Sequence, residues 1–130
     1  MSKVLVDSSV WISFFKGEED GKLLFPLLDS NQVCVNDLIL AELIPSLLQR
    51  KEIALVSLLK SIEKKELEIN WDEIIKIQSC NLKNGLNRVG IPDLIIAENA
   101  IQNQIRLFSF DKHFAIMKDF FELRLYEISK

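Results

Sequence analysis

The stretch VLVDSSVWISFF, residues 4–15, decides how this chain begins to fold. Its first three residues are aliphatic and suit a buried strand, and the segment after Asp7 is predicted to be helical. Asp7 is the only charged residue of the stretch and stands among eight hydrophobic ones. Burying a carboxylate without a partner is costly. The stretch therefore predicts a buried strand that ends on an acid, and the rest of the chain must explain that acid.

Five short β-rich runs alternate with helical patterns along the chain. The runs are KVLV (3–6), QVCV (32–35), LEI (67–69), IRLFSF (105–110) and LRLYEI (123–128). Helices are predicted after Asp7 and over residues 23–30, 38–50, 71–85, 92–104 and 111–120. Strands separated by helices favour a parallel sheet that is covered on both faces. The predicted fold class is α/β, a three-layer α/β/α arrangement with a parallel sheet of about five strands.

Within the predicted helices, a few residues carry more specific signals. The expected buried stripe of the helix over 38–50 comprises Leu40, Leu43, Ile44, Leu47 and Leu48. The pair Asn36 and Asp37 supplies a capping residue for that helix, and Pro92 suits a first helical turn. The glycines are expected at turns and helix ends, at Gly17, Gly21, Gly85 and Gly90.

Length and composition favour one folded domain over residues 1–130. Hydrophobic residues make up 48% of the chain and charged residues 27%, which is too apolar for a disordered protein. Lys3 and Asp7 interrupt the N-terminal apolar residues before a signal peptide can form. No uncharged apolar run approaches the roughly 18 residues that suggest a membrane span. We expect a cytoplasmic protein without a membrane segment.

The cysteines and the net charge exclude some functions and leave others open. Cys34 and Cys80 form no CxxC pair, so we expect buried thiols instead of a disulfide or a zinc site. The net charge of −3 provides no general basic surface for nucleic acid. A negative total can still conceal a local basic surface around an acidic pocket. Composition alone does not identify the partner.

Four carboxylates stand isolated in apolar surroundings. Besides Asp7, these are Glu42 and Asp93, each the sole charge of an apolar segment, and Asp111, which follows the run 105–110. All four lie where a strand or loop turns into a helix, or in the first turns after that point. In open parallel sheets such positions meet at the carboxyl ends of the strands, where ligands usually bind. We therefore expect the four acids to converge.

A convergence of four acids requires a neutralising partner. Two like charges about 4 Å apart repel by roughly 4 kcal/mol at an effective dielectric constant near 20. That energy is a large part of the stability of an ordinary domain. A bound cation removes the repulsion, and oxygen ligands favour Mg²⁺ or Mn²⁺. The sequence thus predicts an open, hydrated metal site.

Three of the acids also have a purely structural interpretation. Asp7 and Asp111 could cap helices that follow strands, and Asp93 could simply favour the positive end of a helix dipole. Glu42 fits this interpretation less well, because its helix is apolar almost all round and predicts a buried carboxylate. Position alone leaves both interpretations open.

The motifs VLVDSSVWISFF, LAELI, GIPDLIIAENA and LFSFDKHF resemble, in order and spacing, those of PIN-domain ribonucleases, especially the VapC-type toxins of toxin–antitoxin pairs. The resemblance spans nearly the whole chain. It implies that one or two Mg²⁺ or Mn²⁺ ions are held by a catalytic and metal-binding quartet, Asp7, Glu42, Asp93 and Asp111. Ser9 matches the hydroxyl residue that follows the first acid in the family, and Ser109 replaces the usual Thr. His113 stands where a second Asp is frequent, which puts a fifth acidic ligand in doubt.

The resemblance implies endonucleolytic hydrolysis of RNA by a metal-activated water. It also implies a homodimer and a cognate antitoxin as partners. No histidine base is needed, so we expect His113 on a helix surface outside the chemistry. Basic residues near the acidic motifs are candidate RNA contacts, although a solvated face explains them equally well: Lys16, Lys83, Arg88 and Lys112. Glu98 is about 140° round a helix from Asp93 and should point away from the metal.

Three other functions remain as alternatives. The same fold could serve a nuclease that acts in RNA maturation or on DNA flaps. A phospho-accepting receiver domain also clusters acids around Mg²⁺, but it requires paired acids after the first strand, and here two serines follow Asp7. A binding module that has lost catalysis is disfavoured because all four acids are present.

Overall fold

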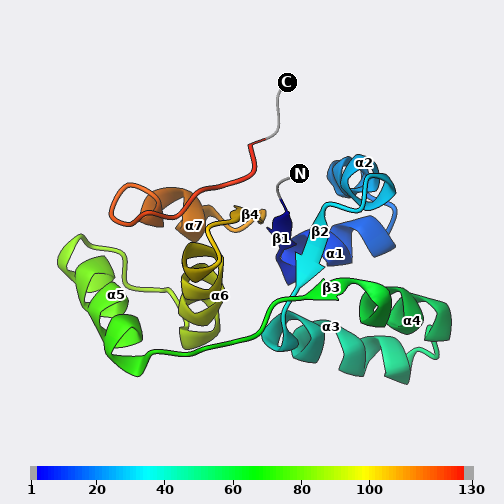
Figure 1. The fold of residues 1–130 in the computed structure, drawn as a ribbon, viewed down its shortest axis with the longest axis horizontal. Helices are drawn as coiled ribbons and strands as arrows, with labels where there is room; N and C mark the ends of the chain where they lie inside the picture. Colours follow the sequence, from blue (N-terminus) through cyan, green and yellow to red (C-terminus); the bar gives the residue numbers. More distant parts are fainter. Residues whose placement is uncertain (1–2, 128–130) are drawn as a thin grey trace.

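The computed structural model describes residues 3–127 and places a parallel sheet at the centre of the molecule (Figure 1). Its strands are β1 (Val4–Val6), β2 (Val33–Val35), β3 (Glu63–Lys64) and β4 (Arg106–Phe108). The strand order is β3-β2-β1-β4, and every pairing is parallel. A parallel bridge between Leu107 and Leu125 extends the pairing beyond β4. The expected sheet of about five strands is therefore confirmed as four strands and one bridge.

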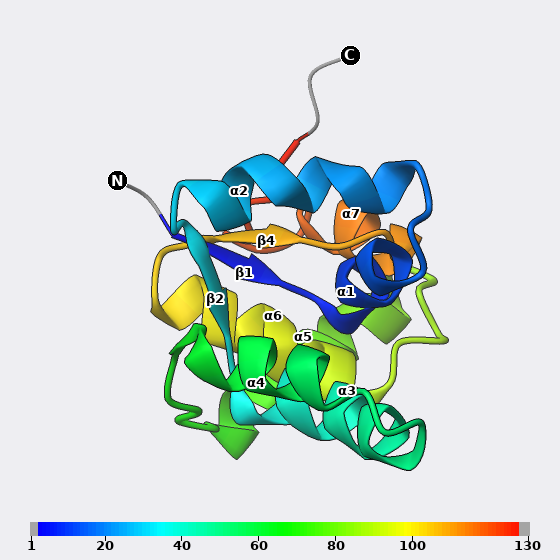
Figure 2. The ribbon, with the colours of Figure 1, turned by 90° about the vertical axis from the view of Figure 1, so that its right-hand side faces the viewer.

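Helices cover both faces of this sheet. They are α1 (Ser8–Phe15), the 3-10 helix η1 (Asp20–Leu24), α2 (Phe25–Asp29), α3 (Asp37–Gln49), α4 (Ile53–Ser61), α5 (Trp71–Lys83), α6 (Ile91–Gln102) and α7 (Lys112–Met117). Figure 1 shows α5, α6 and α7 on one side of the strands and α1 to α4 on the other, and Figure 2 looks onto the second group. The three-layer α/β/α prediction is confirmed. None of the helices described is long and apolar enough to cross a membrane.

The two central strands are completely buried because helices pack on both of their faces. Trp11 of α1 is also fully buried, and its indole Nε1 donates a hydrogen bond to the Val6 carbonyl at 3.2 Å. The first strand and the first helix are thus joined through one side chain of the stretch that opens the chain. Cys34 is buried, as expected, whereas Cys80 is partly exposed, so its predicted burial was wrong.

Local signals placed two helix starts correctly. The Asn36 side chain accepts a hydrogen bond from the Ile39 amide at 2.9 Å and caps α3, and Pro92 lies in the first turn of α6. The expected stripe of α3 is only partly correct. Leu43 and Leu47 are buried, but Leu48 is 52% exposed.

Several element predictions were wrong. The run LEI (67–69) forms no strand, and the third strand is β3, whose two residues are exposed at the sheet edge and carry no apolar signal. The sequence analysis assigned no element to residues 53–61, which form α4. The predicted strand over 123–128 is reduced to the bridge at Leu125, and Ile128 lies outside the described residues.

Gly21 has a packing role that its sequence context did not reveal. Gly17 and Gly85 adopt positive φ angles after helices, as expected, whereas Gly21 lies inside η1 and is buried against α1. A Cβ atom at Gly21 would lie within 2.6 Å of the Phe14 Cα, a separation that real Cβ atoms essentially never show. The absence of a side chain at this position therefore sets how closely η1 approaches α1.

Candidate active site

The site begins where β1 and β4 end side by side. Val6 is in register with Phe108, and the Asp7 amide donates to the Phe108 carbonyl at 2.9 Å. Asp7 directly follows β1, and Asp111 lies three residues beyond β4. Because β2 and β4 flank β1 on opposite sides, the strand order reverses at this point. Ligands of open α/β sheets bind at such a reversal.

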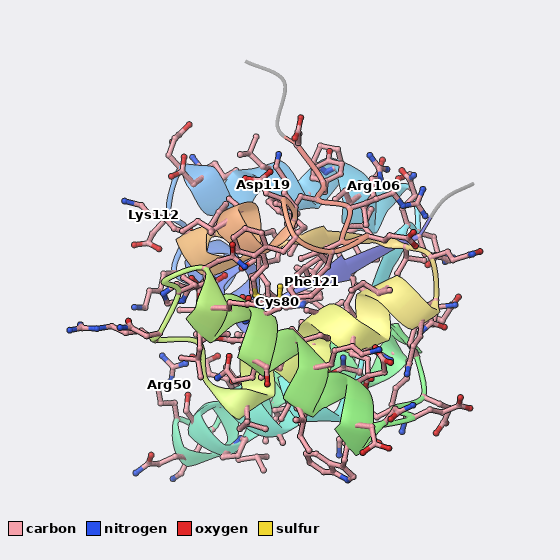
Figure 3. All side chains as sticks on the ribbon, turned by 90° about the vertical axis from the view of Figure 1, so that its left-hand side faces the viewer. Arg50, Cys80, Arg106, Lys112, Asp119 and Phe121 are labelled. Carbon is pink, nitrogen blue, oxygen red and sulfur yellow. The ribbon has the colours of Figure 1, made fainter. Side chains whose placement is uncertain are left out.

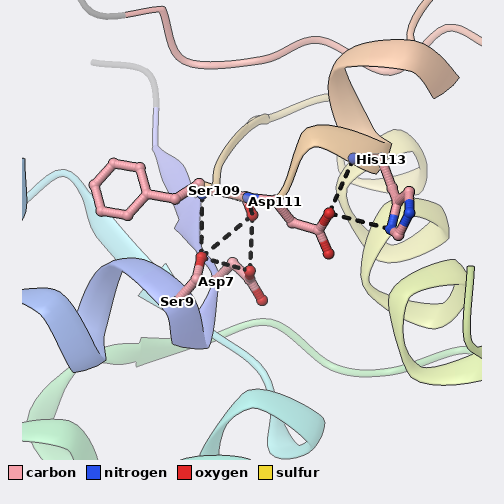
Figure 4. A network of polar contacts seen from close by, with 6 residues as sticks. Asp7, Ser9, Ser109, Asp111 and His113 are labelled. Atoms are coloured by element: carbon pink, nitrogen blue, oxygen red, sulfur yellow. Dashed lines mark hydrogen bonds and ion pairs between the residues drawn. The ribbon is translucent and has the colours of Figure 1, made fainter.

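Two serine hydroxyls fix the carboxylate of Asp7 (Figure 4). Ser9 and Ser109 both donate to Asp7 Oδ2, at 2.9 and 2.8 Å. Their oxygens in turn accept from the amides of Phe110 and Asp111, at 3.1 and 3.0 Å. Asp7 makes no side-chain cap to α1, so the capping interpretation fails here. Within residues 3–127, Asp7 Oδ1 has no hydrogen bond and remains available to another ligand.

Asp111 does cap a helix, and it also contacts His113. Its Oδ1 accepts from the His113 amide at 2.9 Å, at the start of α7. His113 Nδ1 lies 3.1 Å from the same oxygen, but it is buried and makes no hydrogen bond of acceptable geometry. Ligand atoms of Asp93, Asp111 and His113 lie within 4.8 Å of one another. His113 thus lies partly buried beside these acids instead of on an open helix surface, while its absence from the chemistry stays a prediction.

The surroundings of Asp93, which include two other acids, raise its pKa. Burial raises the pKa of Asp93, and the negative charges of Asp111 and Asp7 raise it further, whereas His113 lowers it. Asp93 thus shares one cluster with Asp111 and His113, and the charge of Asp7 also acts on it. Asp93 lies in the first turn of α6, so the helix dipole also favours its charge.

Glu42 joins the same site from α3. Burial of its carboxylate raises the pKa of Glu42, and the charges of Asp7 and Asp93 add to the effect, while a hydrogen bond from Ser8 opposes it. That hydrogen bond joins Ser8 Oγ to Glu42 Oε1 at 3.4 Å. The side chain as a whole is exposed, so the predicted burial of Glu42 was wrong. The reason is that α3 buries a different face, which includes Leu43.

The candidate RNA contacts are all exposed, but they differ in their relation to the acids. Lys16 lines a small hollow between α1 and α3 together with Glu42 and Arg50. Lys112 adjoins Asp111 in sequence, at the first position of α7. Sequence reasoning missed Arg50, the C-cap of α3, which follows Glu42 by about two helical turns.

The other two candidates flank the connection between α5 and α6. Lys83 ends α5, and Arg88 lies in the loop before α6. Neither makes an ion pair or side-chain hydrogen bond within the described part of the chain.

Fold and geometry together define an α/β domain that gathers carboxylates at the carboxyl edge of a parallel sheet, beside its central strand. The model of the PIN domain matches residues 4–119, so the chain belongs to the PIN domain family. No sequence among curated proteins matches it.

Solved structures share this fold over nearly the whole chain. The chain is similar to one in VapBC2 from Rickettsia felis bound to a DNA fragment from their promoter, with TM-score 0.73, 18% identity, and 97% and 98% of the two chains covered. It is also similar to one in DNA-bound VapBC from Salmonella typhimurium, with TM-score 0.74, 16% identity and the same coverage. It is likewise similar to a chain in VapBC-1 from nontypeable Haemophilus influenzae, with TM-score 0.71, 20% identity, and 95% and 96% of the two chains covered. These identities establish a shared fold.

The raised pKa values of Glu42 and Asp93 predict how stability depends on pH. Without divalent metal, the folded state holds protons on these acids at a higher pH than the unfolded chain does. Folding stability should therefore increase as the pH falls through the raised pKa values of the folded state toward the ordinary ones, 4.5 for glutamate and 3.8 for aspartate. The measurement is the urea midpoint against pH in EDTA.

The matched control is the double variant Glu42→Gln and Asp93→Asn, which should lose this increase. Saturating Mg²⁺ should also abolish it in the original protein, because a bound cation favours the ionised acids. An identical pH dependence in the double variant would contradict the assigned cause.

Proposed function

We propose that this protein is a metal-dependent endoribonuclease and the toxin of a toxin–antitoxin pair. The observation that carries the proposal is the convergence of four acids, with Asp7 held by two hydroxyls at the end of the central strand. Membership of the PIN domain family supports nuclease activity. The similar folds in VapBC structures support the toxin assignment.

The residues at the site fit a divalent cation. Asp7 Oδ1 and the Asp93 carboxylate accept no hydrogen bond from residues 3–127, and both face repulsion that a cation would relieve. Asp7, Glu42, Asp93 and Asp111 would hold Mg²⁺ or Mn²⁺ through oxygen. When bound, the ion would lower the pKa of a water and neutralise charge on the phosphate.

The chain's own residues prepare the site for that chemistry. Ser9 and Ser109 keep the Asp7 carboxylate in one orientation, so little reorganisation is needed when a ligand arrives. The Ser9 oxygen also ties the loop after β4 to α1 by accepting from the Phe110 amide, and the Ser109 oxygen accepts from the Asp111 amide within that loop. Lys16 and Arg50, beside Glu42, would bind the RNA backbone through its phosphates.

Cleavage of a total RNA pool tests the proposal. The full chain, freed of any copurified partner, should cleave RNA with Mg²⁺ or Mn²⁺ and lose all cleavage in EDTA. A DNA flap substrate in parallel distinguishes the nuclease alternative, and uptake of beryllofluoride distinguishes a receiver domain. Cleavage that persists in EDTA, or metal-dependent cleavage of the flap alone, would contradict the ribonuclease proposal.

The partner proposals need separate tests. We expect a cognate antitoxin, encoded beside the toxin, which blocks RNA cleavage when added in equal amounts. We also expect a homodimer, with a mass in light scattering of twice 15.0 kDa. A monomer at micromolar concentration would contradict the second expectation and leave the first intact.

We expect His113 to influence which divalent cation the site prefers, because its imidazole lies beside Asp93 and Asp111. Imidazole nitrogen is a better ligand for Mn²⁺ than for the harder Mg²⁺. His113→Ala should therefore weaken Mn²⁺ binding by roughly tenfold, as expected for the loss of a ligand or its support, and Mg²⁺ binding much less. Calorimetric titration of the metal-free protein measures both. Ile116→Ala, an exposed change on the same helix, is the control, and an equal loss for both ions would contradict the role of His113.

A further inference from the structure

A pocket apart from the acidic site lies between α5, α6 and residues 120–122. Its volume is about 360 Å³, within the roughly 300–1,000 Å³ typical of ligand sites. Apolar side chains form its walls, namely Ile77, Ile101, Phe120 and Phe121. Figure 3 looks onto this face and labels Phe121 between α6 and the segment that follows α7.

One lining residue, Glu98, is a buried acid that the proposed nuclease does not use. Its side chain is 5% exposed, and its Oε1 accepts from the Asn70 amide at 3.2 Å. Its Oε2 is buried and has no hydrogen-bond partner among the described residues. A buried carboxylate oxygen without a hydrogen-bond donor destabilises the folded protein, and a bound donor would remove that cost. Burial accordingly raises the pKa of Glu98.

The rim of the pocket is also negatively charged. Glu73 and Glu122 are exposed lining residues, and no lysine or arginine lines the pocket in the described chain. Glu73 pairs with Lys76 at 3.5 Å, but the Lys76 side chain is 76% exposed and lies on the outer surface. An acid at the floor, two at the rim and apolar walls between them complement a cation with an aliphatic stem.

A second hollow lies along α6 and shares lining residues with the pocket. That hollow, of about 520 Å³, is lined by Gln104, Leu123 and Arg124, and the two share Ile101 and Glu122. The two hollows, called the furrow from here on, would together accept an extended stretch of polypeptide beside the cation. A small cation would leave the second hollow unused.

We propose that this pocket binds the side chain of an arginine presented by a protein partner. The planar guanidinium would stack on Phe120 or Phe121 and donate to Glu98, while its methylene stem contacts the apolar walls. Arginine suits the pocket better than lysine because its head is planar, more weakly hydrated and offers several donors. The neighbouring residues of the partner would lie in the furrow along α6.

Titration of the full ¹⁵N-labelled chain with short peptides tests the proposal by NMR. The Asn70 amide, which donates to Glu98, is the reporter. The probe is acetyl-Ala-Arg-Ala-amide, and its control is the same peptide with neutral citrulline, which keeps the shape and loses the charge. We expect saturable changes in the chemical shift of the Asn70 amide with the arginine peptide, and at least tenfold weaker binding of the citrulline peptide.

The variant Glu98→Gln keeps an acceptor for the Asn70 amide and removes the charge. It should therefore lower the affinity for the arginine peptide at least tenfold. If that variant does not fold, Glu122→Gln at the exposed rim should still weaken binding severalfold at low salt and less at high salt. Asp7→Asn should bind the peptide unchanged, because the pocket is separate from the acidic site. Equal binding of the citrulline peptide, or unaltered binding by the glutamine variants, would overturn the proposal. Agmatine binding as tightly as the peptide would make a small cation the occupant and would also overturn it.

Discussion

Asp7→Asn is expected to reduce metal-dependent RNA cleavage by about a thousandfold or more, which corresponds to roughly 4 kcal/mol of transition-state stabilisation. Asn keeps an oxygen that can accept from Ser9 and Ser109, so the local geometry should survive. It removes the charge that would hold the cation. Single-turnover cleavage of a defined RNA, at saturating Mg²⁺ and Mn²⁺, measures the loss.

The same substitution should leave the fold intact and raise stability without metal. The charge of Asp7 raises the pKa of both Glu42 and Asp93, which shows that it repels them in the folded protein. Asp29→Asn is the matched control, because Asp29 is exposed at the end of α2. Full cleavage by Asp7→Asn would exclude the proposed site, whereas lost cleavage with a lowered urea midpoint would indicate a structural role.

Gly21→Ala is expected to lower the free energy of unfolding by about 3 kcal/mol, the upper part of the usual range for overpacking. The added Cβ would meet the backbone of Ser13 and Phe14, which cannot rotate away as a flexible side chain can. Relief therefore requires a shift of η1 away from α1. Urea denaturation measures the change, and for an ordinary domain with roughly 5–15 kcal/mol of stability the loss is substantial.

Gly90→Ala is the matched control for this prediction. A Cβ at Gly90 meets only Pro92 Cδ, at 3.5 Å, and the φ angle of −78° suits any residue. Its effect should stay within about 1 kcal/mol. Equal losses from the two variants would show that the contact between η1 and α1 yields easily. Because α1 also carries Ser9, a real displacement of that helix should weaken metal binding in Gly21→Ala as well.

Local pattern predicted the parts of the fold that depend on neighbouring residues. Alternating β-rich and helical segments indicated a parallel α/β sheet, and that topology alone brings strand ends such as Asp7 and Asp111 to one edge. The cap at Asn36 and the place of Pro92 in a first helical turn were also predictable, since both depend on residues within one turn of the helix. The two-residue edge strand β3 was missed because its exposed charged residues carry no apolar signal. Helix α4 was missed although Val56 and Leu59 of its apolar run stand at helical spacing.

The sequence by itself thus determined the class of fold, the order of its principal elements and the set of acids that the sheet gathers. Only the tertiary structure decided that Glu42 is exposed, that His113 contacts Asp111, and that Glu98 lies at the floor of a separate pocket. Ser9 and Ser109 illustrate the physical reason, since they are 100 positions apart and meet at 3.4 Å. Periodicity and capping describe interactions within one element, whereas such contacts depend on how separate elements pack against each other.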